Sequence, residues 1–141
     1  MTNRSMPDGV FIPELAYTSV PEAAEWLCRA FGFKERLRIA DHRAQLSFGA
    51  GSMVVTEGGR AHASVPSAAD DSHGVMVRVP NVDEHCERAT RAGAKILRAP
   101  ADHPFGERQY TAIDLGGHRW TFSQTIADSD PASWGGRLVE L

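Results

Sequence analysis

The sequence predicts an α+β fold, a single domain built from two tandem units of strand, helix and three strands. In each half, a run of alternating apolar and polar residues precedes an amphipathic helix with its own N-terminal capping residue and a glycine at its end. Three further strand-like runs then follow each helix. The length of 141 residues is that of one ordinary domain. Because the two halves share the order of elements and few residues, the repeat is one of pattern.

The first unit covers about residues 10–58. The alternation over 11–18 (FIPELAYT) predicts a strand. Ser19 and Glu22 have the spacing of a capping box, and Gly32 provides a left-handed C-terminal cap, so a helix is expected between them. Three strands are expected at 33–40, 43–48 and 52–57.

The second unit covers about residues 73–126 and repeats this order. A strand is expected over 73–80, Asn81 is an N-cap with Glu84 at its third position, and the helix ends at Gly93. Strands follow at 94–98, 109–114 and 118–125. The stretch between the units, about 59–72, is small, polar and aperiodic, which predicts a linker.

The turn Asp114-Leu115-Gly116-Gly117 joins the last two strands. We expect the Asp114 carboxylate to cap this turn, with positive φ angles at the two glycines. By alternation His118, Trp120 and Phe122 face the helix side and build the core, and Arg119, Thr121 and Ser123 face the other side.

Composition and charge exclude several classes of partner. The net charge is −3 with scattered basic residues, so nucleic acid is not expected as a partner. No stretch approaches the ~18 apolar residues that span a bilayer, and no signal segment is evident, so a cytoplasmic protein without a membrane partner is expected. Cys28 and Cys86 lie in predicted helices without a CxxC pattern and are expected to be reduced core residues.

Three phrases carry a family resemblance over about residues 10–126. They are AAEWLCRAFGF (23–33), NVDEHCERATRAGAKI (81–96) and PFGERQYTAIDLGGHRWTF (104–122). In this order they resemble the vicinal oxygen chelate superfamily, which contains glyoxalase I, ring-cleaving dioxygenases and bleomycin-resistance proteins. The resemblance implies a mixed sheet curled around a cleft, helices on its convex side, and a homodimer.

Metal enzymes of that superfamily take one ligand, His, Gln or Glu, from the first and last strand of each module. The corresponding positions fall near Ile12, Val55, Gly74 and Thr121, with Glu14 and Glu57 sharing the facing of the first two. Because this set lacks the required donors, we expect no metal and no other cofactor. A divalent metal remains the alternative, since a shift of one residue would bring His73 into position. His42, His62, His85 and His103 are expected to be solvated and not to bind a metal.

The predicted cleft has an apolar floor and a few charges. Its expected lining comprises Glu14, Glu57, Met76, Arg78, Phe105, Arg108, Arg119, Thr121, Ser123 and Trp134. Phe105 is expected to form an apolar lip and Arg108 to contact an anion or amide, the alternative being a surface pair of Glu107 with Arg108. In the tail, 127–141, Trp134 is expected to dock on its own domain, on a partner or over the cleft, and docking that stabilises the fold is preferred.

These observations favour a metal-independent protein that binds an aromatic or amphipathic small molecule in a cleft of a homodimer. The alternative is a lyase, isomerase or dioxygenase of the same superfamily. Such an enzyme would depend on a metal if the strand register is shifted, or would be a metal-free isomerase with Glu14 or Glu57 as base.

Overall fold

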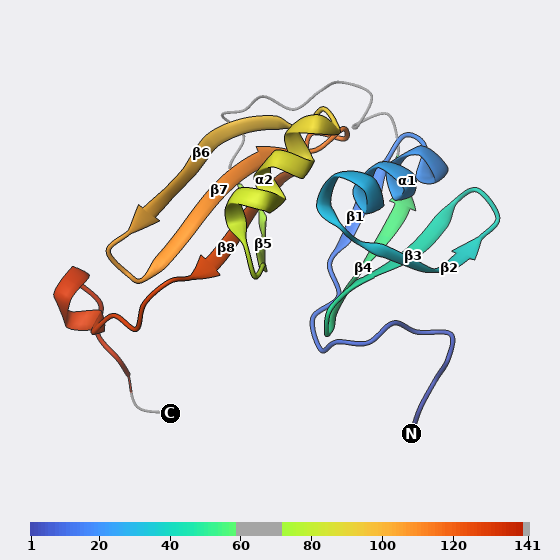
Figure 1. The fold of residues 1–141 in the computed structure, drawn as a ribbon. Helices are drawn as coiled ribbons and strands as arrows, with labels where there is room; N and C mark the ends of the chain where they lie inside the picture. The colour runs from blue at the N-terminus through green and yellow to red at the C-terminus, as the bar shows by residue number, and fades with distance from the viewer. Residues whose placement is uncertain (59–71, 140–141) are drawn as a thin grey trace.

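The computed structural model describes residues 1–58 and 72–139. The fold is α+β, with the strands arranged in two four-stranded mixed sheets (Figure 1). The predicted linker, 59–72, lies outside the described residues except for Ser72. In the described part of the chain, neither helix is long and apolar enough to cross a membrane.

The first unit forms sheet A, in the strand order β1-β4-β3-β2. Its elements are β1 (Glu14–Tyr17), α1 (Val20–Phe31), β2 (Lys34–Ile39), β3 (Arg43–Phe48) and β4 (Gly51–Glu57). β1 runs parallel to β4, and the other neighbours are antiparallel.

The second unit forms sheet B, in the matching order β5-β8-β7-β6. Its elements are β5 (Val75–Arg78), α2 (Val82–Arg91), β6 (Lys95–His103), β7 (Glu107–Ile113) and β8 (Arg119–Thr125), followed by the 3-10 helix η2 (Pro131–Trp134). β5 runs parallel to β8. The predicted repeat of strand, helix and three strands is therefore confirmed.

Both helices begin where their capping residues predict. Ser19 Oγ accepts from the backbone N–H of Glu22 at 3.3 Å, and Asn81 Oδ1 accepts from that of Glu84 at 3.1 Å. Gly32 ends α1 with a φ of 86°, a left-handed conformation that costs glycine little.

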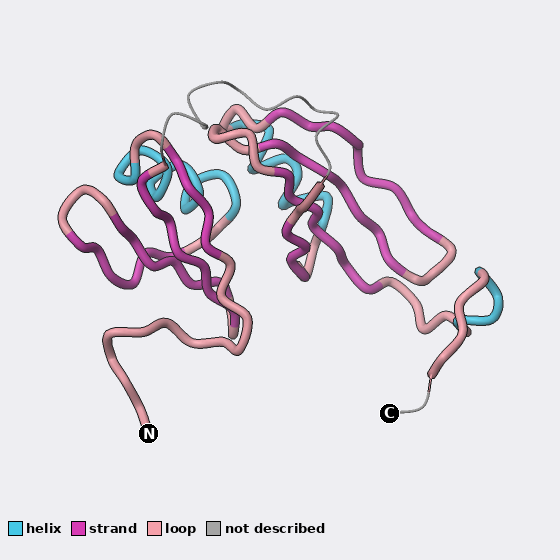
Figure 2. Tube along the Cα trace, turned by 180° about the vertical axis from the view of Figure 1, so that it is seen from behind, coloured by secondary structure: helices cyan, strands magenta, loops and turns pink. Residues whose placement is uncertain are grey.

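The core lies between the helices and one face of each sheet. The two helices lie next to each other where the sheets approach (Figure 1), and Figure 2 shows the same elements from behind. Phe31, at the end of α1, packs on Trp120 and Phe122 of β8 with ring centroids 5.4 and 4.7 Å apart. The first module therefore contributes an aromatic side chain to the core of the second.

We call the face of each sheet that points away from the helices its open face. On sheet A it carries Glu14, Ala16, Gln45, Ser52, Val54 and Thr56; on sheet B it carries Met76, Arg78, Gln109, Thr111, Thr121 and Ser123. Residues at the alternate positions, such as Val55 and Trp120, belong to the core.

Asp114 connects the two modules. Its Oδ1 accepts from the backbone N–H groups of Gly116 and His118, both at 2.9 Å, as a turn former should. Its Oδ2 accepts from Tyr17 Oη at 2.6 Å and from Trp120 Nε1 at 3.0 Å. Of the two glycines, only Gly117 has the expected positive φ. At Gly116 a glycine is needed for a different reason, since an added Cβ would lie 2.6 Å from the Tyr17 ring.

Several predicted strand boundaries are wrong, those of β1, β6 and β7 among them. The strand expected to end at Arg98 continues as β6 through Pro100 to His103. A proline is tolerated here because β6 is an edge strand and its hydrogen-bond pairing with β7 is already irregular on both sides of Arg98. β1 begins only at Glu14, and Phe11, expected in the strand, is 89% exposed.

His85 is not solvated, contrary to the expectation. Nε2 donates to the Phe31 carbonyl at 2.8 Å, which leaves Nδ1 to accept from Tyr110 Oη at 2.5 Å. His85 follows Val82 by three residues and precedes Ala89 by four, so it shares their inward face of α2. Burial, and secondarily the charge of Arg88, lowers the pKa of His85.

Candidate ligand-binding site

A cavity of about 570 Å³ lies on the open face of sheet B. Its lining combines apolar and charged groups: Met76 and Arg78 of β5, Phe105 of the β6–β7 turn, Glu107 and Gln109 of β7, and Ser123 of β8. The strand residues reach one surface because residues two apart on a strand point the same way.

The polar groups of this cavity are linked by hydrogen bonds. Gln109 Nε2 donates to Ser123 Oγ at 2.9 Å, and Ser123 Oγ donates to Glu107 Oε1 at 2.6 Å. Arg78 Nη1 donates to Thr125 Oγ1 at 2.6 Å. Because these contacts restrain the side chains, a ligand meets groups that are already oriented.

Glu107 is held in its ionised form. Hydrogen bonds from Ser123 and Thr125, and the nearby charge of Arg78, lower the pKa of the Glu107 carboxyl group. At neutral pH it is therefore a hydrogen-bond acceptor. A general base in this range would instead need a raised pKa.

Aromatic rings border the cavity at the β6–β7 turn. Phe105 stacks on His103 with centroids 5.1 Å apart and packs on Trp134 at 5.3 Å. Ser129 Oγ donates to the Pro104 carbonyl at 2.8 Å, so the tail docks on its own module. Trp134 is 44% exposed and touches the cavity only through Phe105.

The cavity brings together four of the predicted lining residues, Met76, Arg78, Phe105 and Ser123. Thr121 lies on the same face of β8, two residues before Ser123, and its hydroxyl oxygen is 3.1 Å from that of Thr111. Arg119 also has this facing but sits at the start of β8, away from the cavity.

Arg108 does not reach the cavity, contrary to the prediction. It forms ion pairs with Asp83 of α2 at 3.1 Å and with Asp102 of β6 at 2.9 Å. Since Glu107 and Gln109 point to the open face, the residue between them points to the helix side. The alternative surface pair of Glu107 with Arg108 is not formed for the same reason.

Glu14 and Glu57, the predicted catalytic candidates, lie apart from this cavity. Glu14 is on the open face of sheet A, exposed, with Arg43 at 3.7 Å. Glu57 pairs with Tyr17 of β1 and lies two residues after buried Val55, so its position faces the helices. It is exposed because it lies at the end of β4.

Sequence reasoning missed Glu107 and Gln109 as site residues. Because the last-but-one strand was expected to begin at Gln109, the two side chains were not placed in phase. Extending the alternation back to Glu107 would have placed both on the face of Ser123, the cross-strand partner of Gln109.

The residues present do not fit a divalent metal ion. Across the open faces of β1, β4, β5 and β8 the central side chains are Glu14, Val54, Met76 and Thr121, of which only the carboxylate is a usual ligand for a hard cation. His73 is exposed before β5 and differs in facing from Met76. Residues 1–58 and 72–139 contain no group of three or more His, Cys, Asp or Glu side chains arranged to hold a metal.

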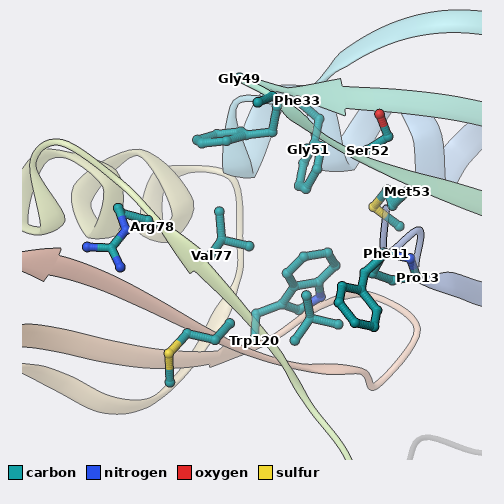
Figure 3. Close-up of a pocket in the computed structure, with 14 residues that line it drawn as sticks. Phe11, Pro13, Phe33, Gly49, Gly51, Ser52, Met53, Val77, Arg78 and Trp120 are labelled. Carbon is teal, nitrogen blue, oxygen red and sulfur yellow. The ribbon is translucent and has the colours of Figure 1, made fainter. Parts of the chain in front are cut away.

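A second cavity, of about 520 Å³, lies between the two modules (Figure 3). It is mostly apolar, lined by side chains that include Phe33, Met53, Val77 and Trp120, and Phe11 and Pro13 close one side. Met76 and Arg78 line this cavity as well, so β5 separates it from the cavity on the open face.

Comparison with solved structures places this chain among relatives of one fold. TioX from Micromonospora sp. ML1 is 36% identical, with a TM-score of 0.68, and the match covers 86% of this chain and all of TioX. The fosfomycin resistance protein FosX from Listeria monocytogenes is 15% identical over 84% of this chain and 94% of its own, with a TM-score of 0.65. A glyoxalase/bleomycin resistance protein/dioxygenase from Alicyclobacillus acidocaldarius is 15% identical over 90% and 96%, with a TM-score of 0.67.

A comparison with curated proteins gave no match. A family model matches residues 12–122, which span most of both modules and include every residue that lines the cavity of sheet B except Ser123. The chain therefore belongs to the Glyoxalase/Bleomycin resistance protein/Dioxygenase superfamily.

Proposed function

We propose that this protein binds an aromatic or amphipathic small molecule on the open face of sheet B without a metal ion. The observation that carries the proposal is the restrained set of Glu107, Ser123 and Gln109 beside exposed Met76 and half-buried Phe105. A concave surface with apolar area and a few oriented polar groups is typical of ligand sites. Arg78 and Glu107 offer charges of both signs to polar substituents.

The same surface supports a binding protein over an enzyme. The lowered pKa of Glu107 suits recognition of a donor, and Glu14 and Glu57 are exposed and do not line this cavity. The lack of suitable donors on the open faces speaks for metal independence.

We also propose that two copies pair. β1 and β5 are both edge strands of their sheets, and among the described residues no strand pairs with their outer edges. Phe11 and Met76, which lie at these edges, are 89% and 65% exposed beside an apolar cavity. Unpaired edges and exposed apolar side chains of this kind are typical of an interface.

The binding proposal is tested with 8-anilinonaphthalene-1-sulfonate, an aromatic anion, titrated by fluorescence into protein dialysed against EDTA. We expect saturable binding that Arg78→Gln weakens about tenfold, because the sulfonate loses its cation. Arg29→Gln, an exposed arginine of α1, serves as the matched control and should bind as the unaltered protein does. Binding that disappears with EDTA and returns with Mn²⁺ or Ni²⁺ would overturn the proposal.

A further inference from the structure

The first residues of the chain lie across the open face of sheet A. Nη2 of Arg36 donates to the carbonyl of Arg4 at 2.9 Å, and Nε2 of Gln45 donates to the carbonyl of Ser5 at 2.9 Å. We call residues 3–9 the N-terminal arm. Figure 1 shows it running beside sheet A before the chain enters β1.

Two further features hold the arm on this face. Pro7 is buried, although residues 1–6 and 8–11 are exposed. Gly9 lies at ordinary contact distance from the start of β4, since an added Cβ would lie 3.8 Å from the carbonyl oxygen of Ala50 and 4.0 Å from the backbone nitrogen of Ser52. The arm therefore crosses from β2 and β3 to β4.

The two hydrogen bonds from the sheet recognise the main chain of the arm, and Pro7 is the one residue of the arm that is not exposed. The two contacts are to carbonyls of consecutive residues, while the side chains of Arg4, Ser5 and Met6 are exposed. Any extended chain with two successive amide carbonyls presents the same acceptors. The contacts thus define a ligand chemistry that is independent of sequence.

The two donors on the sheet are linked to each other. Gln45 is 4% exposed with the arm in place, and its Oε1 accepts from Nη1 of Arg36, which turns its Nε2 toward the arm. The pair therefore presents two neighbouring donors to the main chain of the arm.

Ser52 provides a second, independent indication. Its Oγ is buried, and within the described residues it has no hydrogen-bond partner. Ser52 has the same facing on β4 as Val54, and it also lies among the residues that line the cavity between the modules (Figure 3). The open face thus holds a hydroxyl that the arm leaves unused.

We propose that the open face of sheet A is a second binding site, for an extended peptide-like chain with successive amide carbonyls, and that the N-terminal arm occupies it as an internal ligand. Residues 1–13 form no helix or strand, and two hydrogen bonds and buried Pro7 hold the arm, so a second chain of the same chemistry would compete with it for the site. The site is separate from the cavity of sheet B and does not depend on the function proposed there.

Binding is tested with a fluorescein-labelled peptide of residues 2–9, TNRSMPDG, added to full-length protein and followed by anisotropy. In Pro7→Asp, whose arm loses its buried anchor, we expect the peptide to bind at least about tenfold tighter than in the unaltered protein, because the competing arm is weakened. Adding Arg36→Ala should reverse this gain. Adding Arg38→Ala, an arginine paired with Glu35 on the same strand, should leave it unchanged.

Release of the arm is tested separately in variants that keep Pro7. Trypsin cleavage after Arg4 should be about tenfold faster in Arg36→Ala than in Arg38→Ala, since cleavage tracks the undocked population. Equal cleavage rates in these two variants, or peptide binding that is indifferent to Pro7→Asp and Arg36→Ala, would overturn the proposal.

Discussion

The Asp114 carboxylate is the residue on which the two modules converge, since it accepts from Tyr17 of the first module and from Trp120 of the second. Tyr17→Phe should lower the free energy of unfolding by about 1–3 kcal/mol, because a buried carboxylate oxygen loses a donor. Urea unfolding measures this loss. Thr18→Ala, at the exposed neighbouring position, is the control, and equal stability of the two variants would show that the bond contributes nothing.

His85 should make stability depend on pH. Its folded pKa lies below the unfolded value of about 6.5, so the unfolded chain binds the proton first. The contribution of neutral His85 is therefore complete above about pH 6.5 and is lost as pH falls through the lowered folded pKa. When the pH falls from 7.5 to 5, the free energy of unfolding, measured with urea, should fall less in His85→Gln than in the unaltered protein. His42→Gln, in an exposed turn, should retain the full loss.

Single residues could be predicted where local chemistry decides their role. Asp114 was predicted as a turn former because an aspartate before two glycines has a local function, and the structure confirms it. His85 could not be placed, because its partners, the Phe31 carbonyl and Tyr110, are distant in sequence. Arg108 was misplaced because one residue of strand phase reverses its facing.

At the scale of elements, the β6–β7 turn anchors the C-terminal tail. Gly106 has a φ of 83°, its carbonyl accepts from Ile126, and an added Cβ would lie 2.3 Å from the Ala127 carbonyl. Gly106→Ala should therefore destabilise the protein more than the roughly 1 kcal/mol typical of backbone strain alone.

Gly49→Ala provides the comparison in the same urea experiment, since Gly49 also has a positive φ, 56°, but its added Cβ meets nothing within 4 Å. A loss in Gly106→Ala no larger than that in Gly49→Ala would mean that the tail moves away without cost.

The elements were predictable to the extent that their signals are local. Ser19, Asn81 and Gly32 mark helix ends by hydrogen bonds within a few residues, and both helices were located from them. The extension of β6 through Pro100 depends on its position at a sheet edge, which the local sequence does not contain. Glu107 and Gln109 were missed as site residues for a different reason, because β7 was expected to begin at Gln109 and begins at Glu107.

For the whole molecule, pairing of two copies should depend on the apolar edge around β1. Phe11→Asp should shift the protein toward monomer in sedimentation experiments, because it places a charge beside the apolar cavity between the modules. Leu138→Asp, an exposed leucine in the tail, should leave the oligomeric state unchanged. A monomeric unaltered protein at micromolar concentration would refute the pairing.

The central claim is metal-independent binding on the open face of sheet B, and it is tested most directly by an NMR titration of metal-stripped protein with 8-anilinonaphthalene-1-sulfonate. The backbone amides of Gln109 and Ser123 belong to this cavity alone, whereas Phe33 and Met53 belong to the cavity between the modules. We predict saturable shifts at Gln109 and Ser123 in the presence of EDTA. Shifts confined to Phe33 and Met53, or shifts at Gln109 and Ser123 that require an added divalent metal, would contradict the account.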